Sequence, residues 1–526
     1  MKQNQSYIGY LLPRIDEIIF ISFFLGAISL GPRMLNIDGD LGRHLAIGRY
    51  ILGERQIPTS DVFSHTMYGE YLTPHEWLAQ VCFASANSWG GLNGVVLLCA
   101  ILLGITYTIC FKQCYQQSQV YSISLVFTVI GASAASLHWL ARPHLFTLLM
   151  VALWMEGINQ VSEKNARWMW LCPILRLFWA NLHGAFIVGF VILVLCIIAR
   201  CLDILFIERK VGKSFVYHLW NDQTIRGYVI IGIASFIATL LNPSGWYLWR
   251  TVFDFLQNRY LVSHTAEYLP PNFHHPSTIP FLIFIALSLL IFGLKKQRAS
   301  TKDVLLLTAW TAMGLYSVRN IPIYALIVAP ILSGLIGIGG EISHSHDVDK
   351  SYTSKFFWES LKEKIYNFEL RLKYVNSLIK GYTIPIAVVS IVLLLFSNGI
   401  NLDLKGRGNQ FDPHVFPVEA VNWLVANPPM GNMFNYFPWG GYLLYRLHPM
   451  QRVFIDGQTD FYGESLTREY ETVITLSNGW EEILDKYRIE WVIFPSDSIL
   501  VKELLGQPKW KLVYQDQVTS VFFLDR

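Results

Sequence analysis

Long apolar runs separated by short polar segments make up most of the first 400 residues. Several runs reach the roughly 20 residues that cross a bilayer as a helix, and shorter ones gain length from aromatic flanks. Ten runs stand out: Ile18–Leu35, Val95–Phe111, Val120–Leu137, Leu145–Ile158, Ala185–Ile207, Tyr228–Leu241, Ile279–Leu294, Val304–Val318, Ile323–Ile338 and Ile384–Phe396. With the short run Trp168–Ala180, the pattern predicts a polytopic α-helical membrane protein of about 11 spans.

The lysines predict which side of the membrane each loop faces. If the N-terminus is cytoplasmic and every run crosses once, all lysines before residue 400 fall on the cytoplasmic side, as the positive-inside rule requires. Seven arginines then fall outside: Arg43, Arg49, Arg55, Arg142, Arg250, Arg259 and Arg319. The first run lacks a small-residue cleavage site, which favours a retained anchor. We therefore expect a multi-pass protein of the cytoplasmic (inner) membrane, N-terminus in and C-terminus out.

The periodicity changes twice in the second half of the chain. Residues 341–380 have amphipathic helical character and should form a cytoplasmic segment. Residues 399–526 combine expected strands at 452–456, 490–495, 510–516 and 520–525 with expected helices at 417–427 and 465–476. The sequence thus predicts a membrane domain, residues 1–398, with a first outer loop at 36–92, and an extracytoplasmic α/β domain, residues 399–526.

Composition agrees with this fold class and excludes several functions. Of 526 residues, 53% are hydrophobic and 15% are charged, whereas soluble domains average about 25% charged. A net charge of +3 gives no reason to expect a nucleic-acid partner. The seven cysteines form no disulfide framework. Gly440–Gly441 are not followed by a lysine at the spacing of a nucleotide-binding P-loop.

Polar residues collect in segments that this topology places on the outer face. These segments are 36–80, 138–144, 179–184, 241–246, 264–275 and 317–322. Ionisable groups at membrane depth are costly and usually face a cavity or one another. Several separate loops that present Asp, His, Arg and Asn to one surface therefore predict a single site there.

Asp38 and Asp40 are the candidate catalytic residues. Two carboxylates separated by Gly39 suit a divalent cation or a shared proton. The alternative is a turn, because Asp-Gly is a turn dipeptide. No cofactor is indicated with certainty, and a divalent cation is compatible with this spacing.

The candidate substrate-binding residues come from four of the outer segments. They are Arg43, His44, Asp61, His75, Glu76, Arg142, His144, Asn181, His183 and Arg319. Plainer interpretations stand beside them: Asp61 fits a cap or turn, His183 a packed turn, and Arg319 an ion pair with an external carboxylate. His75 and Glu76 do not form a zinc-protease motif, because the position four after His75 is Ala79.

The first outer loop resembles that of integral-membrane glycosyltransferases of the C-type fold, in particular their bacterial relatives. The matching residues are Asp38, Asp40, His44–Leu45, Gly48, Ile51, Pro58, Asp61, Phe63–Ser64 and His75–Leu78. The later segments 142–144, 181–184, 242–245 and 439–463 are also similar. The chain departs from the family at Gly42 and Arg43, where the relatives have tryptophans.

This resemblance implies an enzyme that moves a sugar from a polyprenyl-phosphate donor to an acceptor hydroxyl, with inverting hexosyl or pentosyl transfer. The acceptor would be an envelope glycan, a lipid or a protein, and membrane lipids would be further partners. Asp38 would be the base, and Arg142, Arg319 and Arg43 would stabilise the leaving phosphate. A transporter or flippase for lipid-linked glycans and an assembly scaffold are the alternatives. The first is disfavoured because its polar residues should lie near the membrane midplane.

Overall fold

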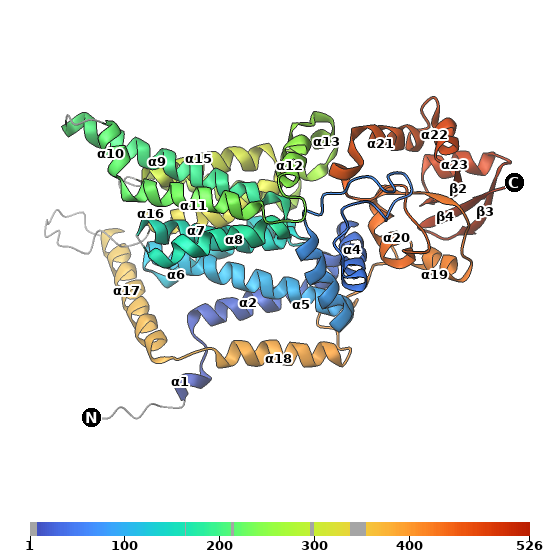
Figure 1. Cartoon of the computed structure of the whole chain (residues 1–526). Coiled ribbons are helices and arrows are strands. Elements are labelled where there is room, and N and C mark those ends of the chain that lie inside the picture. Colours follow the sequence, from blue (N-terminus) through green and yellow to red (C-terminus); the bar gives the residue numbers. More distant parts are fainter. Residues whose placement is uncertain are drawn as a thin grey trace.

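The computed structural model (Figure 1) describes residues 8–163, 165–211, 215–294, 299–336, 354–404 and 406–525. Six of the lysines used to orient the chain lie outside the described residues: Lys2, Lys164, Lys213, Lys295, Lys296 and Lys350. Residues 341–353 of the expected cytoplasmic segment also lie outside them. The rest of that segment forms the helix α17, Ser354–Leu378.

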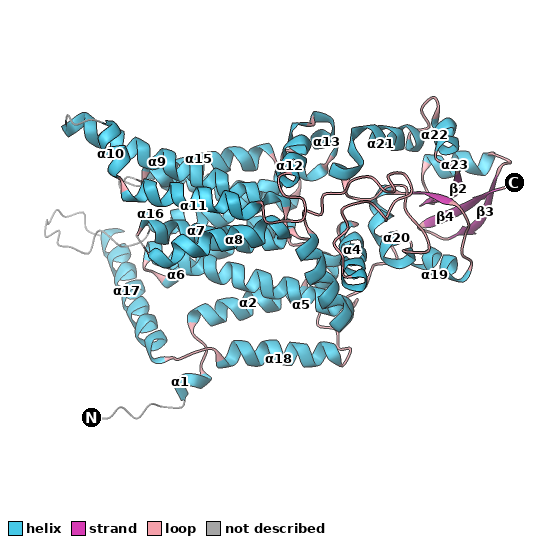
Figure 2. Cartoon of the chain, in the orientation of Figure 1, coloured by secondary structure: helices cyan, strands magenta, loops and turns pink. Residues whose placement is uncertain are grey.

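Parallel and antiparallel helices packed side by side form the larger part of the chain (Figures 1 and 2). The helices of this bundle are α1 (Ile8–Leu11), α2 (Ile15–Ser29), α3 (Gly31–Asn36), α4 (Asp40–Glu54), α5 (Trp77–Ser118), α6 (Tyr121–Ala135), α7 (His144–Ser162), α8 (Ala166–Leu182), α9 (Ile187–Val211), α10 (Phe215–Asn221), α11 (Gln223–Thr239), α12 (Tyr247–Gln257), α13 (Arg259–His264), α14 (Ile279–Leu294), α15 (Thr301–Tyr316), α16 (Ile321–Ile336), α17 and α18 (Thr383–Ser397). Single 3-10 turns lie between several of them, including η2 (Gly184–Phe186), η3 (Ala266–Tyr268) and η5 (Val318–Asn320).

Six helical stretches among the described residues are long and apolar enough to cross a membrane. They are Trp77–Ser118, Tyr121–His138, His144–Ser162, Gly184–Phe206, Pro276–Leu294 and Val318–Ile336. A seventh arises if the pair Tyr366–Leu378 and Thr383–Ser397, bent by 75°, counts as one span. The remaining predicted runs form shorter helices, among them α2, α8, α11 and α15. The count of about eleven spans and the orientation of the termini therefore remain predictions.

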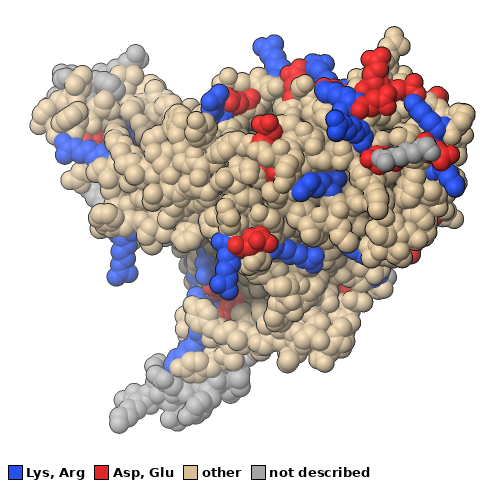
Figure 3. All heavy atoms as spheres, turned by 45° about the vertical axis from the view of Figure 1, so that its right-hand side comes forward, with Lys and Arg blue, Asp and Glu red and all other residues tan. Residues whose placement is uncertain are grey.

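The two ends of the bundle differ. Figure 1 shows α1, α10 and α17 at one end, and α4, α12 and α13 at the opposite end, where the C-terminal region packs. On the face drawn in Figure 3, charged side chains gather over this C-terminal region, while the surface over the helices is mostly uncharged. We call the end that meets the C-terminal region the site end of the bundle, formed by residues 36–76, 138–144, 181–184 and 264–268.

The C-terminal region folds around a four-stranded mixed sheet with the strand order β1-β2-β4-β3. Its elements are α19 (Val418–Ala426), β1 (Asn432–Asn435), α20 (Gly440–Leu447), α21 (Thr459–Ile474), α22 (Trp480–Lys486), β2 (Ile489–Pro495), α23 (Ile499–Gly506), β3 (Trp510–Gln515) and β4 (Thr519–Leu524). β1 runs parallel to β2, and the other two pairs are antiparallel.

The predicted strands near 490–495, 510–516 and 520–525 are confirmed as β2, β3 and β4. The predicted helices at 417–427 and 465–476 correspond to α19 and to most of α21. The strand predicted at 452–456 is wrong, because its one β-type contact in the described chain is an isolated bridge between Val453 and Ser64 of the first outer loop. Strand β1 was not predicted. Its sequence, Asn-Met-Phe-Asn, is short and carries a strand-disfavouring residue at each end.

Helices α4 and α20 touch through their backbones. A Cβ at Gly42 would overlap the backbone of Gly441, and a Cβ at Gly441 would overlap the Gly39 carbonyl. Leu41 and Leu45 of α4 share one buried core with Tyr442 and Leu443 of α20. The first outer loop and the C-terminal region therefore hold each other in a fixed relation, and this contact positions the residues described next.

Candidate active site

Arg142 brings both candidate catalytic aspartates together. Its guanidinium contacts the Asp38 carboxylate at 3.2 Å and the Asp40 carboxylate at 2.5 Å. Asp38 also accepts a hydrogen bond of 3.0 Å from the backbone N–H of Asp40, the first residue of α4. The turn interpretation of this motif applies, since Asp38 caps the turn with one oxygen and faces Arg142 with the other. A shared proton or a divalent cation between the two carboxylates remains a prediction.

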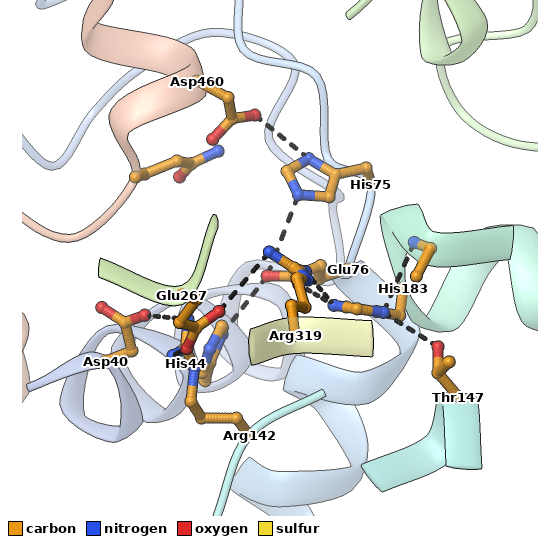
Figure 4. Close-up of polar contacts among 12 residues, drawn as sticks. Asp40, His44, His75, Glu76, Arg142, Thr147, His183, Glu267, Arg319 and Asp460 are labelled. Carbon is orange, nitrogen blue, oxygen red and sulfur yellow. Dashed lines mark hydrogen bonds and ion pairs between the residues drawn. The ribbon is translucent and has the colours of Figure 1, made fainter. Parts of the chain in front are cut away.

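Glu267 links Arg142 to a second arginine. Its carboxylate pairs with Arg142 through one oxygen and lies 3.5 Å from Arg319 through the other. Arg319 also donates a hydrogen bond of 3.1 Å to the Tyr268 hydroxyl. Two cations from separate loops thus hold one anionic group between them, and Figure 4 shows this arrangement beside Asp40.

A second cluster centres on Glu76, the residue that precedes helix α5. Its carboxylate lies 3.5 Å from Arg43, 3.7 Å from His44 and 3.6 Å from His183. His75 lies at 4.0 Å. Arg319 connects this cluster to the first one, because its guanidinium lies 3.0 Å from the His183 ring (Figure 4).

The C-terminal region supplies one wall of the site. Arg43 donates a hydrogen bond of 3.1 Å to Gln458 and lies 3.9 Å from the Asp456 carboxylate. His75 lies 3.6 Å from Asp460, at the start of α21. Gly457 sits so close to the Asp40 carboxylate that a Cβ there would overlap it. Residues more than 400 positions apart in the chain therefore meet in one cluster.

Gly42 and Arg43, where the chain departs from the family pattern, both serve this contact with the C-terminal region. Gly42 leaves room for the α20 backbone, and Arg43 reaches Gln458 and Asp456. A tryptophan at position 42 could not occupy this space. Charge and close backbone packing thus replace the aromatic rings of the relatives at these two positions.

We expect Gly42→Ala to lower thermal stability, because the added methyl group forces α4 and α20 apart. Overpacking of this kind costs about 1–3 kcal/mol, and thermal unfolding of the purified protein measures it. Gly53→Ala on the same helix is the matched control, because a Cβ there has no atom within 4 Å. An equal effect of the two substitutions would contradict the role given to Gly42.

Burial and neighbouring charges set the protonation of the site carboxylates. Burial raises the pKa of Asp38 to about 6, with Asp40 raising it further and Arg142 opposing the shift. Burial likewise raises the pKa of Asp456 to about 6. For Glu267, burial also favours the neutral acid, but Arg142 and Arg319 together outweigh it and hold the pKa well below its usual value. Glu267 is thus a fixed anion, while Asp38 titrates close to neutral pH.

Three candidates form hydrogen bonds with groups outside these two clusters. The Asp61 carboxylate accepts hydrogen bonds from the backbone of Phe63 and from the Ser64 hydroxyl, which is the turn role that the sequence left open. Asn181 accepts a hydrogen bond from the Trp77 indole and donates to the carbonyl of Leu241. The His144 ring donates to the carbonyl of His138. These side chains shape the loops around the site.

Sequence reasoning did not single out Glu267, Asp456, Asp460 or Thr147. Glu267 belongs to the outer segment 264–275, which was noted only as a polar loop, and Asp456 and Asp460 to a run noted for its resemblance to the family. Thr147 lies inside an apolar run, where one hydroxyl gives no signal. The alternative that Arg319 forms an ion pair with an external carboxylate was the one expectation that pointed toward Glu267.

Among the described residues, no group of three or more His, Cys, Asp or Glu side chains is arranged to hold a metal ion. The charged group that contacts both aspartates is the Arg142 guanidinium. A requirement for a divalent cation therefore remains a prediction.

Comparison with known proteins finds similarity at the level of structure. No family model and no curated protein matches the sequence. The archaeal oligosaccharyltransferase AglB from Archaeoglobus fulgidus, in complex with an inhibitory peptide and a dolichol-phosphate, aligns over 91% of this chain and 69% of its own, with 11% identity and a TM-score of 0.56. The apo form of the Archaeoglobus fulgidus oligosaccharyltransferase aligns over the same 91% of this chain and 69% of its own, with 12% identity and a TM-score of 0.53.

ArnT from Cupriavidus metallidurans, bound to undecaprenyl phosphate, aligns over 96% of this chain and 97% of its own, with 14% identity and a TM-score of 0.50. The resemblance inferred from the first outer loop is thereby confirmed for the fold. Together with the apolar helices, these alignments identify the chain as a multi-pass membrane protein with a GT-C-like fold.

Proposed function

We propose that this protein is a glycosyltransferase of the cytoplasmic membrane that uses a polyprenyl-phosphate-linked sugar and acts on the extracytoplasmic face. The observation that carries the proposal is the Arg142–Glu267–Arg319 bridge beside Asp38 and Asp40. Two arginines that already hold a carboxylate between them can hold a phosphate in the same way. Two structural neighbours contain dolichol-phosphate or undecaprenyl phosphate, which supports a donor of this class.

The reaction joins the acceptor to the sugar and releases polyprenyl phosphate. Asp38 removes the proton from the acceptor hydroxyl while the acceptor oxygen forms a bond to the anomeric carbon. The bond from that carbon to the phosphate oxygen breaks on the opposite face, and the electron pair leaves with the phosphate. Arg142 and Arg319 neutralise the growing negative charge. The sugar transferred, a hexose or a pentose, inverts its configuration because one displacement occurs.

The supporting residues have distinct tasks in this scheme. Asp40 holds Arg142 in place and orients Asp38 through its backbone N–H. Glu76, His44 and His75, with Arg43, form the polar wall toward the C-terminal region, where an acceptor glycan, lipid or protein would approach. The site end of the bundle lies next to the apolar helices, so an isoprenoid tail can stay in lipid while its phosphate reaches the arginines.

Transfer should weaken as the pH falls below about 6. The base acts in its deprotonated form, and the pKa of Asp38 is about 6. The ratio kcat/KM should therefore fall about tenfold per pH unit below that value and level off above it. Asp456 has a similar pKa, so the Asp456→Asn variant is the informative comparison. Its kcat/KM should still fall below about pH 6, as in the wild type. A profile that is flat from pH 5 to 7 would contradict Asp38 as the base.

The function itself is tested with the full-length protein in membrane vesicles. Vesicles are supplied with polyprenyl-phosphate donors that carry radiolabelled sugars, and release of polyprenyl phosphate is measured with movement of label into glycan, lipid and protein fractions. We expect release that requires intact Asp38. Release from none of these donors would refute the enzyme. Label that crosses the bilayer while still attached to polyprenyl phosphate would instead indicate a transporter or flippase.

A further inference from the structure

A chain of buried polar contacts connects Trp179, Thr147 and His183 to Arg319. The Trp179 indole N–H donates to the Thr147 hydroxyl at 2.9 Å, and Thr147 Oγ1 lies 2.9 Å from His183 Nδ1. On the other side of the same ring, His183 Nε2 lies 3.0 Å from Arg319 Nη2. Thr147, Trp179 and His183 are all buried, and Figure 4 shows the ring held between Thr147 and Arg319.

The chemistry of arginine fixes the direction of these bonds. A guanidinium has only N–H donors, so His183 Nε2 must accept the bond from Arg319. Burial, with Arg319 and other neighbouring cations, holds the pKa of His183 well below its usual value, so the ring is neutral. Its one proton is then on Nδ1. The acceptor for that proton is the Thr147 oxygen.

The other tautomer has partners as well. The backbone N–H of Ala185 lies 3.4 Å from His183 Nδ1, and a Glu76 carboxylate oxygen lies 3.6 Å from Nε2. With the proton on Nε2, the ring would accept from Ala185 and donate to Glu76, and its N–H would oppose the Arg319 N–H. The Thr147 hydroxyl can accept from Nδ1–H or donate to an unprotonated Nδ1, so it bonds to the ring in both tautomers. The tautomer protonated on Nδ1 is the one that gives Arg319 an acceptor, and it depends on the Thr147 oxygen, whereas an unprotonated Nδ1 also has the Ala185 N–H as a donor.

We propose that Thr147 is a positioning residue that selects the His183 tautomer and thereby aims Arg319 at the donor phosphate. This inference rests on the proposed function. Without the Thr147 oxygen, a buried Nδ1–H has no acceptor, which is a costly state. The ring then adopts the tautomer that accepts from Ala185 and points its Nε2–H toward Glu76. Arg319 loses one of its three contacts, keeping those to Tyr268 and Glu267.

The test is binding of undecaprenyl phosphate to the full-length protein in nanodiscs. Thr147→Val keeps the side-chain shape and removes the oxygen, and we expect affinity to fall about tenfold, which corresponds to 1.4 kcal/mol. Thr147→Ser restores the oxygen and should restore most of the affinity. Thr106→Val is the matched control, because within the described part of the chain the bond of that buried hydroxyl is to the carbonyl of Leu102 in its own helix.

Combination with Arg319→Gln separates positioning from general stability. If Thr147 acts through Arg319, Thr147→Val should cause little further loss of affinity in the Arg319→Gln background, because residues in one network are not additive. Full additivity, or unchanged affinity of Thr147→Val alone, would overturn the inference. Wild-type protein that binds no undecaprenyl phosphate would instead refute the proposed function, so the two failures are distinguishable.

Discussion

Asp38→Asn should reduce sugar transfer by at least about 100-fold, which is the lower range for loss of a positioned general base. The substitution leaves an oxygen that can accept the hydrogen bond from the Asp40 N–H, so the start of α4 should be unchanged. The ability to take a proton from the acceptor is lost, together with the negative charge that pairs with Arg142. Initial rates of polyprenyl-phosphate release from a labelled donor measure the effect.

Two comparisons make this result specific. Asp254→Asn on α12 removes a carboxylate whose ion pair with Arg250 is exposed to solvent, and it should leave the rate unchanged. Asp40→Asn weakens the Arg142 contact without removing the proposed base, and it should slow transfer less than Asp38→Asn does. If Asp40→Asn abolishes transfer and Asp38→Asn retains it, the base is Asp40.

Arg142→Gln should lose both activity and stability. Removal of one stabilising cation from a developing charge costs roughly 100–1,000-fold in rate. In addition, three carboxylates are left close together without their shared cation. We expect a loss of about 2 kcal/mol in the free energy of unfolding, less than for a fully buried pair, because the Arg142 side chain is 21% exposed.

The stability loss has a predictable pH dependence. Without Arg142, the carboxylates repel one another and their pKa values rise in the folded state, so the variant should regain stability as the pH falls and they take up protons. Thermal unfolding of both proteins at pH 5 and 7.5 measures this. Arg142→Lys keeps the charge and should keep most of the stability, while the loss of the planar fork should still slow transfer. A variant Arg142→Gln as stable at pH 7.5 as at pH 5, relative to wild type, would argue against the three-carboxylate cluster.

The assembly of the outer loops could be predicted because loops between consecutive spans alternate sides. That rule placed Asp38, Arg142, His183 and Arg319 on one face, and the structure brings all four into one connected set of contacts. The fold class was also predictable, because apolar runs of membrane length have few alternatives. Which carboxylate each arginine contacts was not, since a polar loop such as 264–275 offers several groups and the sequence carries no distances.

The C-terminal contribution was the least predictable part. The run 452–456 has three consecutive apolar residues, as a buried strand does, yet it contacts the first outer loop through Val453 and Ser64. Its last residue, Asp456, reaches Arg43, and the nearby Asp460 reaches His75, because Gly42 and Gly441 allow two backbones to touch. Such tertiary contacts override the local sequence pattern. Thr147 likewise could not be predicted, because a single hydroxyl inside an apolar helix does not stand out in the sequence.

The glycine contact between α4 and α20 also has a consequence for biosynthesis. The hydrogen-bond partner of Arg43 is 415 positions later in the chain. The contacts that form the polar wall of the site therefore cannot form while the ribosome is still synthesising the bundle. A nascent chain that has inserted its helices but lacks residues 440–460 exposes Asp40, Arg43 and His75 without their final neighbours. Premature termination after α18 but before residue 440 should therefore yield an inserted but incomplete protein. The last quarter of translation then decides when the site becomes competent.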